Sequence, residues 1–403
     1  MSSTIPTSSE GSGTATGRHV RPVARRQHIT VIAATHPLTV GAAPFNAAMV
    51  AALRQHDDVD LISWTRPYPP LLYRGDTVDD ASRPPRVEQA TFMLDWAGPR
   101  TWRRAARRMR GNETAAVVIP WLHPVSAPPV SWLLRHAPPG AERIILCHNV
   151  STHERVPLGN RITVRTLRHA DRFVIHAPHQ RDELAALGIA ATPVVEAFHP
   201  RFVASDLAVQ PSADAILGER ARQGDPDLLL LCFGAVRPYK GVDIALEALP
   251  LVDPSLAVRL IVAGRFWEGR DALERIVTRL GIAHQVEFRD RYIDNEETAL
   301  LFRSADAAVL PYRSASQSGV VGLAFAHDTP VVASRVGGLP QAVADGIDGV
   351  LVASEDPVAL ARGIERLARE RSTLVKGVRR GQGAHSFERY AGLLAEAIRG
   401  AAQ

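Results

Sequence analysis

Cysteine is scarce in this sequence: the 403 residues include only Cys147 and Cys232, each at the end of an apolar run. A disulfide framework would need more thiols, so we expect two buried thiols in a reducing compartment. No stretch approaches the roughly 18 uninterrupted apolar residues of a spanning helix. The first 27 residues are rich in Ser, Thr and Gly and lack the apolar core of a secretion signal. We therefore expect a disordered leader and a cytoplasmic protein.

Several familiar motifs are missing as well. The sequence contains neither the Gly-x-x-x-x-Gly-Lys-Ser/Thr loop of P-loop ATPases nor the Gly-x-Gly-x-x-Gly turn of ordinary dehydrogenases. It has no cluster of residues with metal-ligand spacing, and no repeat of about 20–50 residues. The net charge of +5 favours an anionic partner but does not choose among phosphates, membranes and nucleic acid. Nucleic-acid binding would depend on this charge alone, and we do not expect it.

From His28 onward, short apolar runs alternate with amphipathic helical patterns. Continuous apolar strands that alternate with helices are typical of parallel sheets covered on both faces. The alternation pauses at about 198–211 and restarts at Asp227, so we expect two α/β domains. Their expected bounds are 28–205 and 206–380, after the leader 1–27, and a helical stretch at 381–403 is expected to pack on the first domain. The expected strands are 29–34, 59–64, 116–120, 143–147, 172–175, 194–197, 228–233, 259–263, 286–289, 307–310, 331–334 and 350–352, with a loop from about 63 to 85.

The first candidate site follows a strand of the second expected domain, where ligands of open parallel sheets bind. In "LCFGAVRPYKG" (231–241), a strand ends at Gly234 and a helix opens at Gly241, with Arg237 and Lys240 between them. Arg can grip a phosphate with two parallel hydrogen bonds, and Lys adds a mobile charge. The alternative is an ordinary strand-to-helix turn with solvated charges.

A second candidate is the small-residue loop in "LPYRSASQSGVVGLAFAHDTPVVASRVGG" (310–338). Ser318, Gly319 and Val320 would present successive backbone N–H groups at a helix start, with Gln317 beside them. A helix N-terminus favours anions by about 0.3–1 kcal/mol. Together with the cationic turn, this loop would hold two phosphates without a metal.

A third candidate combines "VAGRFWEGR" with the following "EFRDRYIDNEE". Gly264 closes a strand in the first of these segments and would let a ligand approach the backbone. Tyr292 in the second would face a base. For Tyr292, ordinary core packing is the alternative.

These motifs occur in a specific order: "FGAVRPYKG", "IVAGRFWEG", "VEFRDRYI", "LPYRSASQSGV", "TPVVASRVGGLPQAV", "DGIDGVLV" and "DPVALARGI". Over residues 227–370 the series resembles the nucleotide-sugar half of the family 4 retaining glycosyltransferases. The resemblance implies the GT-B architecture, in which two Rossmann-like domains with parallel sheets face each other across a cleft. It also implies that Arg237 and Lys240 contact the donor diphosphate, and that the amides at 318–320 contact its distal phosphate.

The sequence departs from the family pattern in one respect. Many members place two glutamates eight positions apart around the small-residue loop, the first facing the sugar and the second the ribose. When the chain is aligned on "TPVV" (329–332), the corresponding residues are Ala315 and Leu323. The chain resembles the branch of the family that carries "QSGV" at this place, where Gln317 is expected to replace some sugar contacts. The base and the sugar of the donor are left open.

The first domain supplies candidates for the acceptor side. Gly41, in "THPLTVGAAPFNAAMVAAL", lies where relatives have a Gly-rich loop facing the cleft; a plain tight turn is the alternative. His148 directly follows a strand in "RIILCHNVSTHERVP" and matches the His that relatives place near the reacting sugar; a structural His is the alternative. His123 in "WLHP" and Glu154 are further candidates for the same cleft.

The segment "RTWRRAARRMRG" (Arg100–Gly111) holds six arginines. Trp102, Ala105, Ala106 and Met109 fall at i, i+3, i+4 and i+7, so one helical face is apolar and the rest is basic. Such a helix fits an anionic membrane surface or a lipid-phosphate acceptor, which would hold the protein peripherally at the inner membrane face. The alternative is a surface helix packed through Trp102, with a solvated basic face.

The leading hypothesis is an enzyme, independent of metal and cofactor, that transfers a sugar from a nucleoside diphosphate to an acceptor hydroxyl with retention of configuration. It would serve the synthesis of a glycan, a glycolipid or a glycosylated metabolite. The catalytic residues would be His148, Arg237 and Lys240, of which the two cations would stabilise the departing diphosphate. One alternative is a non-catalytic nucleotide-sugar-binding subunit that supports a partner transferase. Another is a nucleotide-sugar epimerase or phosphorylase of the same fold.

Overall fold

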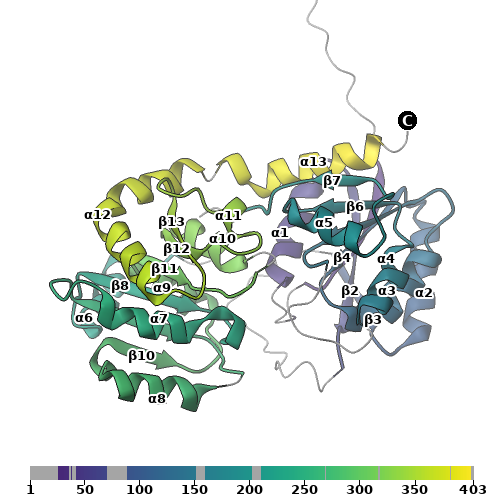
Figure 1. Ribbon diagram of the computed structural model, residues 1–403. Coiled ribbons are helices and arrows are strands. Elements are labelled where there is room, and N and C mark those ends of the chain that lie inside the picture. Colours follow the sequence, from purple (N-terminus) through teal and green to yellow (C-terminus); the bar gives the residue numbers. More distant parts are fainter. Residues whose placement is uncertain are drawn as a thin grey trace, which may run out of the picture.

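The computed structural model describes residues 26–35, 38, 42–69, 89–150, 159–201, 210–267, 269–315, 318–381 and 383–400. Within these ranges the chain forms two parallel sheets, of seven and six strands, each covered by helices (Figure 1). Residues 1–25 of the expected leader lie outside the described residues. No helix among the described residues is both long and apolar enough to cross a membrane.

The first sheet has the order β3-β2-β1-β4-β5-β6-β7, and every neighbouring pair is parallel. Its strands are β1 His28–Ile32, β2 Asp58–Arg66, β3 Ala90–Asp95, β4 Ala116–Trp121, β5 Glu142–Cys147, β6 Arg172–Ile175 and β7 Val194–Glu196. β3 is not among the strands expected from the sequence. This strand lies at the sheet edge and is only partly buried, so it lacks the continuous apolar run that marks the central strands.

Helices cover both faces of this sheet, because alternate strand residues point to opposite sides. Ile29 and Val31 pack with α1 (Ala43–Leu53) on one face. Ile32 packs in the opposite cluster, which holds side chains from the helices of the other face. Those helices are α2 Pro99–Gly111, α3 Ala127–Arg135, α4 Gly159–Leu167 and α5 His179–Ala186.

The second sheet has the order β10-β9-β8-β11-β12-β13 and is also parallel. Chain order reverses between β8 and β11, and ligands of such sheets bind beyond the strand ends at a reversal of this kind. The strands are β8 Leu228–Phe233, β9 Val258–Ala263, β10 Val286–Arg289, β11 Ala307–Leu310, β12 Val331–Ser334 and β13 Gly349–Val352. The helices are α6 Ala213–Arg222, α7 Val242–Ala248, α8 Arg270–Leu280, α9 Asn295–Ser304, α10 Gly319–Ala326, α11 Leu339–Ala342 and α12 Pro357–Gly381.

The last helix, α13 (Phe387–Gly400), returns to the first domain and packs against α1 (Figure 1). Its Tyr390 and Leu394 belong to the same buried cluster as the strand residues beneath α1. The backbone N–H of Arg201 donates to the His385 carbonyl oxygen at 2.7 Å, so the two chain crossings between the domains lie side by side. The expected fold class, two α/β domains with parallel sheets and a returning C-terminal helix, is confirmed.

Candidate functional site

The donor candidate begins with the cationic turn between β8 and α7, which contains Arg237 and Lys240, both half-buried. The Lys240 Nζ donates to the Phe233 carbonyl oxygen at 3.2 Å and lies 5.7 Å from the centre of the Tyr312 ring. The Arg237 guanidinium lies over the Trp267 ring, 4.5 Å from its centre. Aromatic faces and a carbonyl oxygen position both cations without cancelling the charge of Lys240.

Burial changes the acidity of Lys240. It lowers the pKa of the ammonium from its usual 10.5 to about 8, and the charge of Arg237 contributes in the same direction. The ammonium therefore stays charged at neutral pH, although its surroundings compensate the charge poorly. Binding of an anion would restore that compensation and raise the pKa again.

Glycine is needed where the strand ends come closest. Gly264 has a φ of +139°, and a Cβ there would overlap with the Gly234 carbonyl oxygen. Gly241 has a φ of +65°, and a Cβ there would overlap with the Pro311 carbonyl oxygen. The structure thus gives Gly264 a packing reason: its backbone lies directly against the end of β8.

The small-residue loop meets the cationic turn at the reversal point of the sheet. Ser318 precedes α10 with extended backbone, and its hydroxyl lies 3.5 Å from the Tyr312 hydroxyl. The Val320 side chain lies 3.9 Å from the position of a Cβ built on Gly234. Gln317 lies outside the described residues. The N-terminus of α10 and the two cations therefore border the same end of the sheet.

Arg313, which is not among the residues proposed from the sequence, joins the loop after β11 to the turn after β8. Its backbone N–H donates to the Tyr239 carbonyl oxygen at 2.8 Å, and its guanidinium donates to the Pro238 carbonyl oxygen at 2.7 Å. The guanidinium also makes a two-pronged pair with Asp243, at 2.9 and 2.6 Å. Arg313 and Asp243 are 70 residues apart, so no local pattern in the sequence indicates that they pair.

Tyr292 lies further along the same edge. It is half-buried in the loop between β10 and α9, and β10 is two strands from β8 in the sheet. Tyr292 therefore lies at the carboxyl ends of the strands, where the other donor candidates lie, but away from the reversal point between β8 and β11.

His148 follows β5 and is 8% exposed. Its ring packs edge-on against Phe45 at 4.6 Å and lies 5.6 Å from the His176 ring and 6.4 Å from the His199 ring. Burial is the main cause that lowers its pKa to about 3, so the imidazole is neutral at physiological pH. Among the described residues, its buried Nε2 has no hydrogen-bond partner. A buried ring nitrogen usually has a hydrogen-bond partner, so the Nε2 of His148 is available to a polar group that enters here.

His176, which is not among the residues proposed from the sequence, connects this cluster to α13. Its Nε2 lies 2.9 Å from the Tyr390 hydroxyl, and its Nδ1 lies 3.2 Å from the Cys147 carbonyl oxygen. His176 directly follows β6 in "FVIHAP", just as His148 directly follows β5. The same sequence signal would therefore have found it.

Of the remaining acceptor candidates, the structure describes only His123. His123 lies just beyond β4, beside the point where strand order reverses in the first sheet. Its Nδ1 accepts a hydrogen bond from the Val125 N–H at 3.1 Å, so it caps a short 3-10 helix. Gly41 and Glu154 lie outside the described residues.

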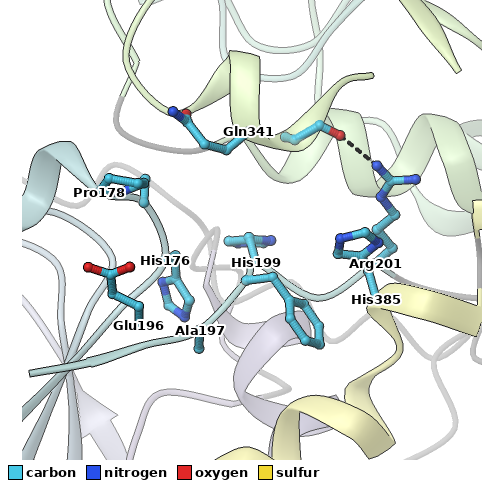
Figure 2. Close-up of a pocket in the computed structure, with 11 residues that line it drawn as sticks. His176, Pro178, Glu196, Ala197, His199, Arg201, Gln341 and His385 are labelled. Carbon is cyan, nitrogen blue, oxygen red and sulfur yellow. Dashed lines mark hydrogen bonds between the residues drawn. The ribbon is translucent and has the colours of Figure 1, made fainter. Parts of the chain in front are cut away.

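A cavity of about 190 Å³ lies at the junction of the two domains (Figure 2). Figure 2 shows Gln341 across the cavity from Pro178 and the hydrogen bond from Arg201 to the Ala342 carbonyl oxygen, at 2.7 Å. Arg201 also pairs with Asp348 at 3.1 Å, and both side chains are buried. This cavity therefore adjoins the segment that connects the domains, and neither Arg237 nor Lys240 lines it.

The basic helix α2 has its apolar side against the sheet. Trp102, Ala105, Ala106 and Met109 are all buried in the core of the first domain. This is the packing that the alternative interpretation of the segment predicts. The apolar side is therefore not available to enter a lipid layer.

Part of the chain matches a known protein family. Residues 227–370 match the family described as "Glycosyl transferases group 1". The D-inositol 3-phosphate glycosyltransferase of Streptomyces griseus is 34% identical over 220 residues, which cover 49% of this chain and 46% of that protein. The enzyme of the same name from Streptomyces bingchenggensis is 34% identical over 252 residues, which cover 57% and 54%. The chain spans about half the length of these curated relatives.

Solved structures match nearly the whole chain. Sucrose-phosphate synthase from Thermosynechococcus elongatus has a TM-score of 0.71 at 21% identity, covering 94% of this chain and 100% of that one. HepE from Anabaena in complex with UDP-glucose has a TM-score of 0.72 at 15% identity, covering 93% and 100%. The protein therefore has the two-domain GT-B fold. The match to the group 1 glycosyltransferases lies within its second domain.

Proposed function

We propose that this protein transfers a sugar from a nucleoside diphosphate to an acceptor hydroxyl, with retention of the anomeric configuration. The proposal depends mainly on one observation: Lys240, Arg237 and the N-terminus of α10 border the same end of the second sheet, at its reversal point. Homology to the group 1 glycosyltransferases supports it, as does the fold shared with a protein solved in complex with UDP-glucose. Metal independence stays a prediction.

In the proposed reaction, the acceptor oxygen attacks the anomeric carbon on the face that the diphosphate leaves. The new carbon–oxygen bond forms as the bond to the diphosphate oxygen breaks, and the acceptor proton passes to the leaving phosphate. Negative charge grows on the diphosphate, where Arg237, Lys240 and the amides at 318–320 would stabilise it. Donors fixed before the reaction in this way are often the largest contribution to catalysis. His148, neutral and lacking a partner at Nε2 among the described residues, would hydrogen-bond the sugar.

A second candidate function is a nucleotide-sugar-binding subunit without activity of its own. It is favoured by the residues that replace the two family glutamates. Ala315 is buried, and its carbonyl oxygen accepts the Gly338 N–H at 3.2 Å, while Leu323 is half-buried. Neither position can present a carboxylate to the sugar or the ribose. The transferase proposal therefore requires that the "QSGV" segment supply these contacts instead.

Lys240 offers a sharp test, because the sequence has only one other lysine, the exposed Lys376 on α12. The purified protein would be given UDP-, GDP- and ADP-sugars, with release of the nucleoside diphosphate as the readout. Lys240→Gln should cost about 2–4 kcal/mol of transition-state stabilisation, or roughly 30- to 900-fold in kcat/KM. Lys376→Gln should have no effect.

One outcome would contradict the role of Lys240, and a second would contradict the transferase proposal itself. Equal turnover in the Lys240→Gln and unaltered proteins would remove the role of the cation. Binding without release would favour the non-catalytic subunit; binding is measured as thermal stabilisation, to which a ligand at 100 times its Kd adds about 2.7 kcal/mol.

A further inference from the structure

The outward side of α2 is a stripe of arginine. Four exposed arginines recur there at i, i+3, i+4 and i+7, opposite the apolar residues that pack on the sheet: Arg100, Arg103, Arg104 and Arg107. Among the described residues these four make no ion pair, whereas Arg108, at the side of the stripe, pairs with Asp60 at 2.7 Å. The stripe therefore presents to solvent positive charge that no acidic side chain in the described part of the chain pairs with.

The positive charge continues over the neighbouring helices. α2 contacts α3, α3 contacts α4, and the three lie on the side of the first domain that is remote from the second (Figure 1). Arg135 ends α3, while Arg161, Arg165 and Arg168 are exposed on α4 and just after it. The residues of these three helices, all of them described by the structure, include no Asp or Glu. We refer to the outward side of α2, α3 and α4 as the α2–α4 face.

Two apolar side chains lie among these cations. Trp132 on α3 is half-buried, stacks on His136 with ring centres 3.8 Å apart, and lies 6.2 Å from Trp102. Ile162 on α4 is 40% exposed. Tryptophan is enriched at the depth of lipid headgroups, where its ring is partly wet and partly apolar.

We propose that the α2–α4 face docks the protein on a membrane surface that contains anionic phospholipids. A lipid surface accepts both features of the face: its headgroups pair with arginine, and its interface receives Trp132 and Ile162. Because the apolar side of α2 is buried in the core, α2 binds through its charge and does not insert. Such binding is reversible and weakens with salt, since exposed charges are screened over about 10 Å at 0.1 M.

This inference goes beyond the proposed function, because docking needs neither donor nor transfer. The full-length protein would be sedimented with vesicles of phosphatidylcholine alone, or with about one third phosphatidylglycerol. We expect binding only to the anionic vesicles at about 0.1 M salt, and its loss at about 0.5 M.

A matched pair of variants tests the face itself. Arg100→Gln/Arg107→Gln removes two charges seven residues apart on α2. Arg362→Gln/Arg369→Gln removes two exposed charges with the same spacing on α12, in the second domain. Each surface cation contributes about fivefold to binding, so the first variant should partition roughly 25-fold more weakly, and the second should be unchanged. Both should unfold at the temperature of the unaltered protein.

Three results would overturn the proposal. One is equal sedimentation with neutral and anionic vesicles, or with neither. Another is an equal loss of binding in both double variants, which would reflect net charge alone. The third is tighter binding to duplex DNA than to anionic vesicles at the same salt concentration, which would assign the face to nucleic acid instead.

Discussion

Lys240 differs from a surface lysine in one measurable property, its pKa of about 8. Since the charged form is the one that binds a diphosphate, affinity for the nucleotide should change little between pH 7 and 8 and fall roughly tenfold per unit above pH 8. The Lys240→Arg variant keeps its charge across this range, so its affinity should not depend on pH. Calorimetric titration with a nucleoside diphosphate between pH 7 and 9.5 compares the two proteins.

Parallel pH profiles in the two proteins would show that Lys240 does not face the phosphates. The free energy of unfolding should depend on pH in the opposite direction from the affinity, which gives a separate check. Because the folded pKa is lowered, the unfolded chain holds this proton more tightly, and Lys240 destabilises the fold below pH 8. That penalty fades as pH rises from about 8 toward 10.5, so loss of affinity above pH 8 cannot be attributed to unfolding at this group.

Single side chains could be predicted as site candidates from the sequence where they directly follow a strand. Side chains whose role depends on a partner far along the chain could not be predicted. Arg237, Lys240 and His148 could be proposed because strand ends are visible as apolar runs. His176 carries the same signal and could have been proposed too. Arg313 could not, because its partner Asp243 lies 70 residues away and nothing in the local pattern relates the two.

The ion pair between Arg313 and Asp243 joins two elements of the second domain, the loop after β11 and the start of α7. If the cationic turn binds the donor as proposed, Arg313 is a positioning residue for Arg237 and Lys240. Arg313→Gln should lower kcat/KM about 10- to 100-fold, because small displacements of catalytic groups are costly. It should change the free energy of unfolding by less than about 1 kcal/mol, since the pair is partly exposed.

Arg303→Gln is the matched control, because Arg303 pairs with Asp328 at 3.1 Å with similar exposure. Asp243→Asn should reproduce the effect of Arg313→Gln, and the double variant should be no worse than either. Additive losses in the double variant, or equal activity in Arg303→Gln and Arg313→Gln, would contradict the positioning role.

The predictability of the strands follows their burial. The central strands are covered on both faces, so they appear as uninterrupted apolar runs, and the expected ranges agree with the structure to within about two residues at each end. The edge strand β3 is half-exposed and mixes polar with apolar residues, so it was invisible. Order within the sheets could not be read from the sequence, because it depends on which strands pair.

In the whole molecule, α13 comes last in the sequence, but its buried side chains pack in the core of the first domain. The hydrogen bond between the Tyr390 hydroxyl and His176 joins the helix to the end of β6, in a buried cluster. Unfolding of the first domain must therefore release α13, and with it the second crossing between the domains.

Tyr390→Phe tests this connection. The variant keeps the ring and leaves the buried His176 Nε2 without its hydroxyl partner, which should lower the free energy of unfolding by about 1–3 kcal/mol. Glu388→Gln, on the exposed side of the same helix, should change it by less than about 0.5 kcal/mol. Urea unfolding followed by separate probes in the two domains provides the measurement. If Tyr390→Phe and Glu388→Gln unfolded at the same urea concentration, α13 would not be anchored through its hydrogen bond to His176.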